Sequence, residues 1–133
     1  MKYMALIYTD PADWERLSQE EQEATFGRYL ALSEEARNAG VYVGAAQLAP
    51  TGDATTVRLR DQETLVTDGP YAEVKEALGG YYLFECASFD DALDWAARIP
   101  GAEHGAIEVR PVYQQAEDET IESAIAAGEG VSS

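Results

Sequence analysis

The sequence is poor in cysteine, histidine and basic residues, and it contains no long hydrophobic run. Its one cysteine, Cys86, excludes an intramolecular disulfide and fits a reducing compartment. The apolar run in MKYMALIYTD at the start is too short for a signal peptide or a membrane span, and no other stretch is longer. We therefore expect a cytoplasmic protein without a membrane partner.

Basic residues number 9 against 25 acidic residues, which gives a formal net charge of -16. A surface this negative repels phosphate backbones and anionic lipid, so nucleic acid and membranes are not expected as partners. An anionic ligand would need a local basic pocket.

Metal and cofactor motifs are also missing from the sequence. One histidine and one cysteine do not make a familiar zinc site. Gly79-Gly80 follows no dinucleotide-binding or Walker pattern and opens a strand rather than a helix. The sequence predicts neither a metal nor a cofactor.

The hydrophobic share of 46% in 133 residues is enough for one domain with one core. Ser18 and Glu21 fit a capping box at the start of a helix that Gly40 ends. Residues at helical spacing mark its apolar face: Phe26, Tyr29, Leu30, Ser33 and Ala36. A second helix begins at Ser88 and ends before Pro100. Strands are expected at 1–8, 41–48, 55–60, 64–67, 79–86 and 107–112, with the third and fourth forming a hairpin. This order predicts an α+β, ferredoxin-like β-α-β-β-α-β fold with a mainly antiparallel sheet. An extra short strand stands in the middle of the element order.

Residues 114–133 differ in composition from the rest of the chain. They hold five acidic residues and no basic one, and they end Gly-Glu-Gly-Val-Ser-Ser. We expect residues 1–113 to form the domain and 114–133 to be an acidic tail, flexible or weakly helical.

Two helices cover only one face of such a sheet, yet several strands look apolar on both sides: MALIY, GYYLF and VYVGAAQL. Packing the uncovered face against that of a second copy would bury it by symmetry. We expect a homodimer that forms an α/β barrel. The alternative is a monomer whose C-terminal tail folds over the sheet.

The densest polar cluster lies between two predicted strands, where loops commonly carry function. Asp68 would act as an acid or base there, and Lys75 would bind an anion or polarise a carbonyl. Tyr71, with Glu76, would contact the ligand. Asp68 also suits an Asx-type turn over Gly69, and the two roles are compatible.

Three further residues are candidates near the last strand. His104 is the only histidine and a natural proton shuttle near neutral pH, although a lone loop histidine is commonly a surface residue. Glu108 and Arg110 share one face of the strand, where they would form an ion pair or bind a ligand. We hypothesise that they meet Lys75 in one pocket.

Longer motifs point to a known family. The run DGPYAEVKEALGGYYLFECASFDDALDWAARIPG, the later EVRPV, and the earlier MKYMALIY and ATTVR together resemble the YCII-related family in its DGPF branch. Tyr71 stands where that branch usually has phenylalanine. The resemblance implies a ferredoxin-like fold and a dimeric α/β barrel, but no settled biochemical role. The wider superfamily includes a dehydrochlorinase of chlorinated hydroxyquinols that uses a histidine and an aspartate.

Two function hypotheses follow. The first is a cofactor-independent lyase or isomerase acting on a small anionic or aromatic ligand, with Asp68 or His104 as acid/base and with Lys75 and Arg110 holding negative charge. The second is a non-catalytic binding or regulatory module, since genes of the DGPF branch often neighbour genes for extracytoplasmic-function sigma factors.

Overall fold

The computed structural model describes residues 1–113, so the predicted tail lies outside the described residues. The elements in chain order are β1 (Lys2–Thr9), α1 (Pro11–Glu15), α2 (Gln19–Asn38), β2 (Tyr42–Gln47), η1 (Thr51–Asp53), β3 (Thr55–Arg60), β4 (Glu63–Asp68), β5 (Ala77–Glu85), α3 (Phe89–Ala97), η2 (Pro100–Glu103) and β6 (Ala106–Pro111), where η marks a short 3-10 helix.

The main sheet has four strands in the order β2-β5-β1-β6, and every neighbouring pair is antiparallel. With α2 between β1 and β2 and α3 between β5 and β6, this is the ferredoxin-like arrangement. The predicted fold class is confirmed. β3 and β4 form a separate two-stranded sheet inserted between β2 and β5.

The helix boundaries follow the capping residues of the sequence. The Ser18 hydroxyl accepts a hydrogen bond from the Glu21 backbone N–H, and the Glu21 carboxylate accepts one from the Ser18 backbone N–H. These two bonds complete the predicted capping box and lower the pKa of Glu21. Gly40 has φ of 76°, the left-handed conformation that ends α2.

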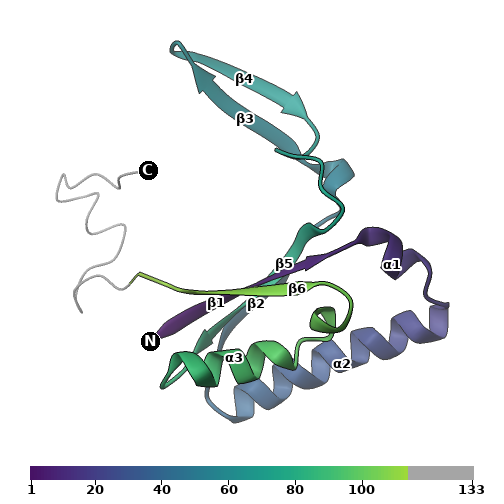
Figure 1. Cartoon of the computed structure of the whole chain (residues 1–133), viewed down its shortest axis with the longest axis vertical. Helices are drawn as coiled ribbons and strands as arrows, with labels where there is room; N and C mark the ends of the chain where they lie inside the picture. The colour runs from purple at the N-terminus through teal and green to yellow at the C-terminus, as the bar shows by residue number, and fades with distance from the viewer. Residues whose placement is uncertain (114–133) are drawn as a thin grey trace.

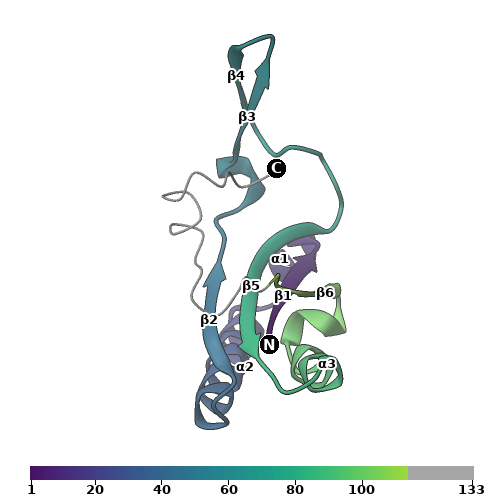
Figure 2. The ribbon, with the colours of Figure 1, turned by 90° about the vertical axis from the view of Figure 1, so that its left-hand side faces the viewer.

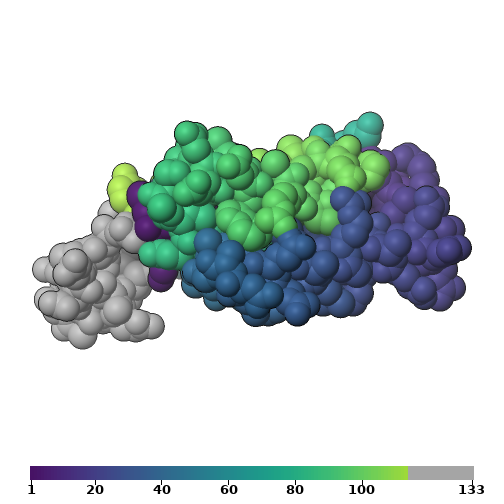
Figure 3. Space-filling model, turned by 90° about the horizontal axis from the view of Figure 1, so that it is seen from below, coloured from purple at the N-terminus to yellow at the C-terminus, as the bar shows by residue number. Residues whose placement is uncertain are grey.

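Helices α2 and α3 lie side by side across one face of the sheet (Figures 1 and 3). The core between them and the sheet is built from buried side chains that alternate along each strand: Tyr3, Ala5 and Ile7 of β1, with Tyr82 and Phe84 of β5. The rings of Tyr82 and Phe84 stack with centroids 5.3 Å apart.

One part of the predicted helix face was wrong. Phe26 and Leu30, assigned to the apolar face of α2, are exposed, whereas Leu32 and Ala36 are the buried residues. Tyr29 packs beside them, half-buried. α2 carries two adjacent apolar stripes, and only the stripe through Leu32 and Ala36 faces the sheet.

Within residues 1–113, no helix covers the other face of the main sheet (Figure 1). The β1 and β5 side chains on this face are half-buried and mainly apolar: Met4, Leu6, Tyr8, Tyr81 and Leu83. β2, at the edge, is more exposed than its sequence suggested. We call this surface the uncovered sheet face; the predicted homodimer would bury it.

The β3–β4 hairpin, residues 55–68, extends away from the main sheet (Figures 1 and 2), and we call it the arm. Its turn residues Asp61 and Gln62 have φ of 50° and 65°. Positive φ at both positions matches a two-residue type I′ turn, whose twist suits a hairpin. The predicted hairpin is therefore confirmed at the predicted turn.

Candidate functional site

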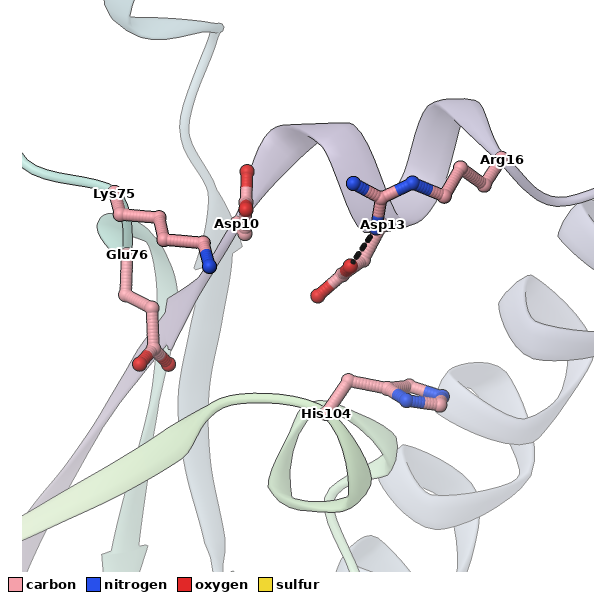
Figure 4. Close-up of a pocket in the computed structure, with 6 residues that line it drawn as sticks. All are labelled: Asp10, Asp13, Arg16, Lys75, Glu76 and His104. Carbon is pink, nitrogen blue, oxygen red and sulfur yellow. Dashed lines mark hydrogen bonds and ion pairs between the residues drawn. The ribbon is translucent and has the colours of Figure 1, made fainter.

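A polar hollow of about 140 Å³ opens at one end of the main sheet (Figure 4). Three segments that are distant in sequence contribute to it: the start of α1, the segment before β5, and the loop before β6. Its lining residues are Asp10, Asp13, Arg16, Lys75, Glu76 and His104.

The α1 side of the hollow is ordered by local hydrogen bonds. The Asp10 carboxylate accepts a hydrogen bond of 2.9 Å from the Ala12 backbone N–H and so caps α1. One turn later, the Arg16 guanidinium donates to the Asp13 carboxylate at 2.6 Å. This pair fixes a cation and an anion on the rim.

Lys75 and Glu76 come from residues 69–76, which join the arm to β5. The next residue, Ala77, pairs with Thr9 at the end of β1, so this segment is held beside Asp10. Figure 4 shows the Lys75 ammonium directed toward Asp10 and the Glu76 carboxylate directed away from it. Both side chains are exposed.

His104 follows η2, a turn that is anchored to α2. The Tyr29 hydroxyl accepts a hydrogen bond of 3.1 Å from the Gly101 backbone N–H. Glu103 forms an ion pair with Arg28, which holds the pKa of Glu103 below its ordinary value and raises the pKa of Arg28. Figure 4 shows the His104 imidazole on the opposite side of the hollow from α1.

The hollow therefore combines three carboxylates, two cations and one imidazole. The carboxylates outnumber the cations and Arg16 is paired with Asp13, so an acidic ligand would be held by contact with Lys75 rather than by a net positive field. The imidazole and the carboxylates are side chains of the types that serve as acid or base in proton transfer. Such convergence of polar groups is typical of a ligand site.

Asp68 and Tyr71 are placed at the base of the arm and are not among the lining residues of the hollow. Asp68 ends β4 and pairs with Thr55. The Arg58 guanidinium carbon lies 5.1 Å from the centre of the Tyr71 ring, a cation–π contact.

Glu108 and Arg110 lie on the uncovered sheet face, opposite Leu6 and Met4 of β1. Glu76 and Lys75 precede Ala77, whose partner is Thr9, five positions beyond Met4. At about 3.3 Å per residue, Arg110 is thus about 16 Å along the sheet from the Lys75 end. Within one chain, the structure does not bring Lys75 and Arg110 into the single pocket that we hypothesised.

Sequence reasoning missed the α1 contribution to the hollow. Asp10, Asp13 and Arg16 were not among the predicted site residues. One signal was available: antiparallel pairing of β1 with β5 places the residues after β1 next to those before β5. Asp10 and Lys75 occupy these positions.

Among residues 1–113, no group of three or more potential metal-ligating side chains is brought together. Cys86 is buried, and burial raises the pKa of its thiol. No helix in this part of the chain is long and apolar enough to span a membrane.

The fold and the hollow define a ferredoxin-like α+β domain with a polar site at one end of its sheet. The YCII-related domain model matches residues 1–116, and the chain belongs to the YCII-related domain family. An uncharacterized protein of Rhizobium meliloti is 41% identical over 114 residues, which cover 84% of this chain and 92% of that protein.

A solved structure is also similar: 5-chloro-2-hydroxyhydroquinone dehydrochlorinase from Burkholderia phenoliruptrix, in complex with 2,5-dihydroxybenzoquinone. The TM-score is 0.52 at 11% sequence identity, and the match covers 90% of this chain and 100% of the other. At this identity the likeness shows a shared fold.

Proposed function

We propose that this chain is a small-molecule enzyme of the lyase or isomerase type that works by proton transfer, without a cofactor, at the hollow beside the DGPY segment. One observation carries the proposal: His104, the only histidine of the sequence, lies with Lys75, Glu76 and Asp10 around one hollow although three separate segments supply them. The similarity of fold to a dehydrochlorinase supports the reaction class.

The chemistry uses the paired charges of the hollow. A carboxylate or His104 takes a proton from a carbon beside a carbonyl group, and the freed electron pair forms a new double bond. The leaving group departs with its own bonding pair, or, in an isomerisation, a second group returns the proton elsewhere. Lys75 and Arg16 stabilise the negative charge that develops on the carbonyl oxygen.

The other predicted residues act around this centre. Asp68 and Tyr71 lie outside the lining of the hollow, at the start of the segment that leads into Lys75 and Glu76, so in this proposal they contact a part of the substrate that extends beyond the hollow. In this proposal Asp68 is a second acid/base group. Exchanging Asp68→Asn keeps the shape and removes the charge, so it should lower turnover at least tenfold with little change in the temperature of unfolding.

The active form is a homodimer in which two copies pack their uncovered sheet faces together. Half-buried apolar side chains on this face support that packing, because two facing sheets approach to about 10 Å and exclude water. Glu108 and Arg110 then face the space between the sheets, where they pair with each other across the interface or where Arg110 binds an acidic part of the ligand.

Binding can be tested by calorimetry with 2,5-dihydroxybenzoquinone, the molecule in the similar solved structure. The proposal predicts saturable binding that Lys75→Met weakens at least tenfold. Arg60→Met, which removes a cation from the arm rather than from the hollow, is the matched control and should change the affinity less than twofold. Equal affinities of the two variants would contradict the assignment of the hollow.

Turnover can be tested by chloride release from 5-chloro-2-hydroxyhydroquinone, the compound named for the dehydrochlorinase. The enzyme hypothesis would be supported if the wild-type protein releases chloride and the His104→Gln variant does not, while that variant still binds 2,5-dihydroxybenzoquinone. Binding without turnover would support the second candidate.

That second candidate is a binding or regulatory module, including one linked to extracytoplasmic-function sigma-factor signalling. The exposure of His104, Lys75 and Glu76 favours it, because catalytic electrostatics are strongest where water is excluded. The same hollow would then hold its ligand without changing it.

A further inference from the structure

The arm carries an apolar face that nothing in residues 1–113 covers. Val57 pairs with Val66 across the hairpin, and Leu59 lies two positions from Val57 on the same face. Their exposed fractions are 63%, 64% and 66% in the order Val57, Val66 and Leu59. Arg58, Leu65 and Thr67 lie on the opposite face of the hairpin.

An isolated two-stranded hairpin is marginally stable in water, and packing on another surface is what usually stabilises it. The arm pairs with no other strand of the described residues. Three large apolar side chains exposed together on such an element mark an interaction surface rather than scattered surface residues.

The position of the arm indicates which surface covers it. Figures 1 and 2 show the arm on the side of the main sheet opposite to α2 and α3, which is the side of the uncovered sheet face. A second copy that packs on that face brings its sheet within about 10 Å of the first. The arm would then extend alongside the second copy instead of into water.

The apolar area that the arm adds to the uncovered sheet face also favours a second copy as the partner. The five half-buried apolar residues of the uncovered sheet face together offer on the order of 300 Å² of exposed surface. A stable interface buries about 800 Å² on each partner. Val57, Leu59 and Val66 add roughly 100 Å² each when they become buried. The arm thus about doubles the apolar area that each partner offers, which brings it closer to that of a stable interface.

We infer that the apolar face of the arm, formed by Val57, Leu59 and Val66, docks on a second copy of this chain and clasps it. The inference rests on the homodimer of the proposed function and adds a second contact to it. Residues 69–76 join the arm to β5, so docking also restrains the segment that carries Lys75 and Glu76. Docking of the arm would therefore also restrain one side of the hollow.

Adjacent substitutions on opposite faces of β4 test the inference. Val66→Glu adds a charge to the apolar face, and Thr67→Glu adds the same charge to the other face. Both positions are exposed in the single chain, so neither change disturbs the core, and circular dichroism verifies this. Sedimentation equilibrium over a dilution series should show a dimer dissociation constant raised at least tenfold by Val66→Glu and changed less than threefold by Thr67→Glu.

The possible results separate the two proposals. A dimer that both variants weaken equally, or not at all, overturns docking of the arm and leaves the sheet-face dimer standing. A wild-type protein that is monomeric at every concentration overturns both. If hydrogen exchange of the arm is slow and becomes fast on truncation after Tyr113, residues 114–133 cover the arm, and docking on a second copy is overturned.

Discussion

Tyr29 and Gly101 are 72 positions apart, and the Tyr29 hydroxyl accepts a hydrogen bond of 3.1 Å from the Gly101 backbone N–H. The Tyr82 hydroxyl in turn donates to the Tyr29 backbone carbonyl at 3.2 Å and lies 2.9 Å from the Ser33 hydroxyl. These contacts link α2, β5 and η2. The turn that carries His104 is thus anchored to the core beside the candidate site.

Tyr29→Phe should destabilise the fold by about 1 kcal/mol, because the Gly101 N–H loses its acceptor while the ring packing is kept. Chemical denaturation measures this free energy of unfolding. Tyr113→Phe is the matched control: Tyr113 is fully exposed, so the same loss of a hydroxyl should have no effect. Equal stabilities of both variants and the wild type would show that the hydrogen bond contributes nothing.

Gly101→Ala should also destabilise, by about 1–3 kcal/mol, through crowding. A Cβ at this position would lie 2.9 Å from the Ile7 Cγ2 atom and 3.1 Å from the Tyr29 hydroxyl. Gly52→Ala provides the control, since a Cβ there meets no atom within 4 Å. The temperature of unfolding should be clearly lower for Gly101→Ala than for the wild type and nearly unchanged for Gly52→Ala. The reverse ranking would contradict the packing described for η2.

Alkaline pH should destabilise the protein through Tyr29 and Tyr82. Burial raises the pKa of both phenols in the folded protein. In the unfolded chain both have the ordinary tyrosine pKa of about 10. A raised folded-state pKa gives stability that is fully present below pH 10 and is lost as the pH rises through the folded-state pKa. Urea unfolding at pH 8 to 11 should show this loss, and Tyr82→Phe should make it shallower. Free ionisation of all tyrosines near pH 10 without any loss of stability would rule this out.

The sequence was sufficient to predict those parts of the fold that depend on local chemistry. Ser18 with Glu21 predicted a helix start because their side chains satisfy backbone groups three residues away. Asp61-Gln62 predicted the hairpin turn because β-branched runs flank it on both sides. The ferredoxin-like order followed from the sequence of such elements and from short connections.

Prediction from the sequence failed for features that depend on which distant segments of the chain pack together. Phe26 and Leu30 have the same helical spacing as the buried stripe, so periodicity alone could not tell which stripe faces the sheet. Arg110 was grouped with Lys75 because the last strand pairs with a central strand in the predicted topology and could therefore approach the loop before β5. The register of β1 against β5 and β6 places them at opposite ends, and charge and composition do not determine that register.

Truncation after Tyr113 should leave both the temperature of unfolding and the oligomer mass nearly unchanged. Residues 114–133 are acidic and lack a strong apolar stripe, which motivates the expectation. Thermal unfolding and light scattering on the full and truncated chains measure the two quantities. Loss of the dimer on truncation would instead identify the segment as part of the interface.

The central claim is that the hollow around His104 binds a small acidic ligand. Since His104 is the only histidine, its imidazole gives one unambiguous set of proton NMR signals in the untagged chain. Titration with 2,5-dihydroxybenzoquinone should shift these signals saturably, and Lys75→Met should require at least tenfold more ligand for the same shift. Imidazole signals that stay unmoved while ligand binding is detected elsewhere in the chain would contradict the account.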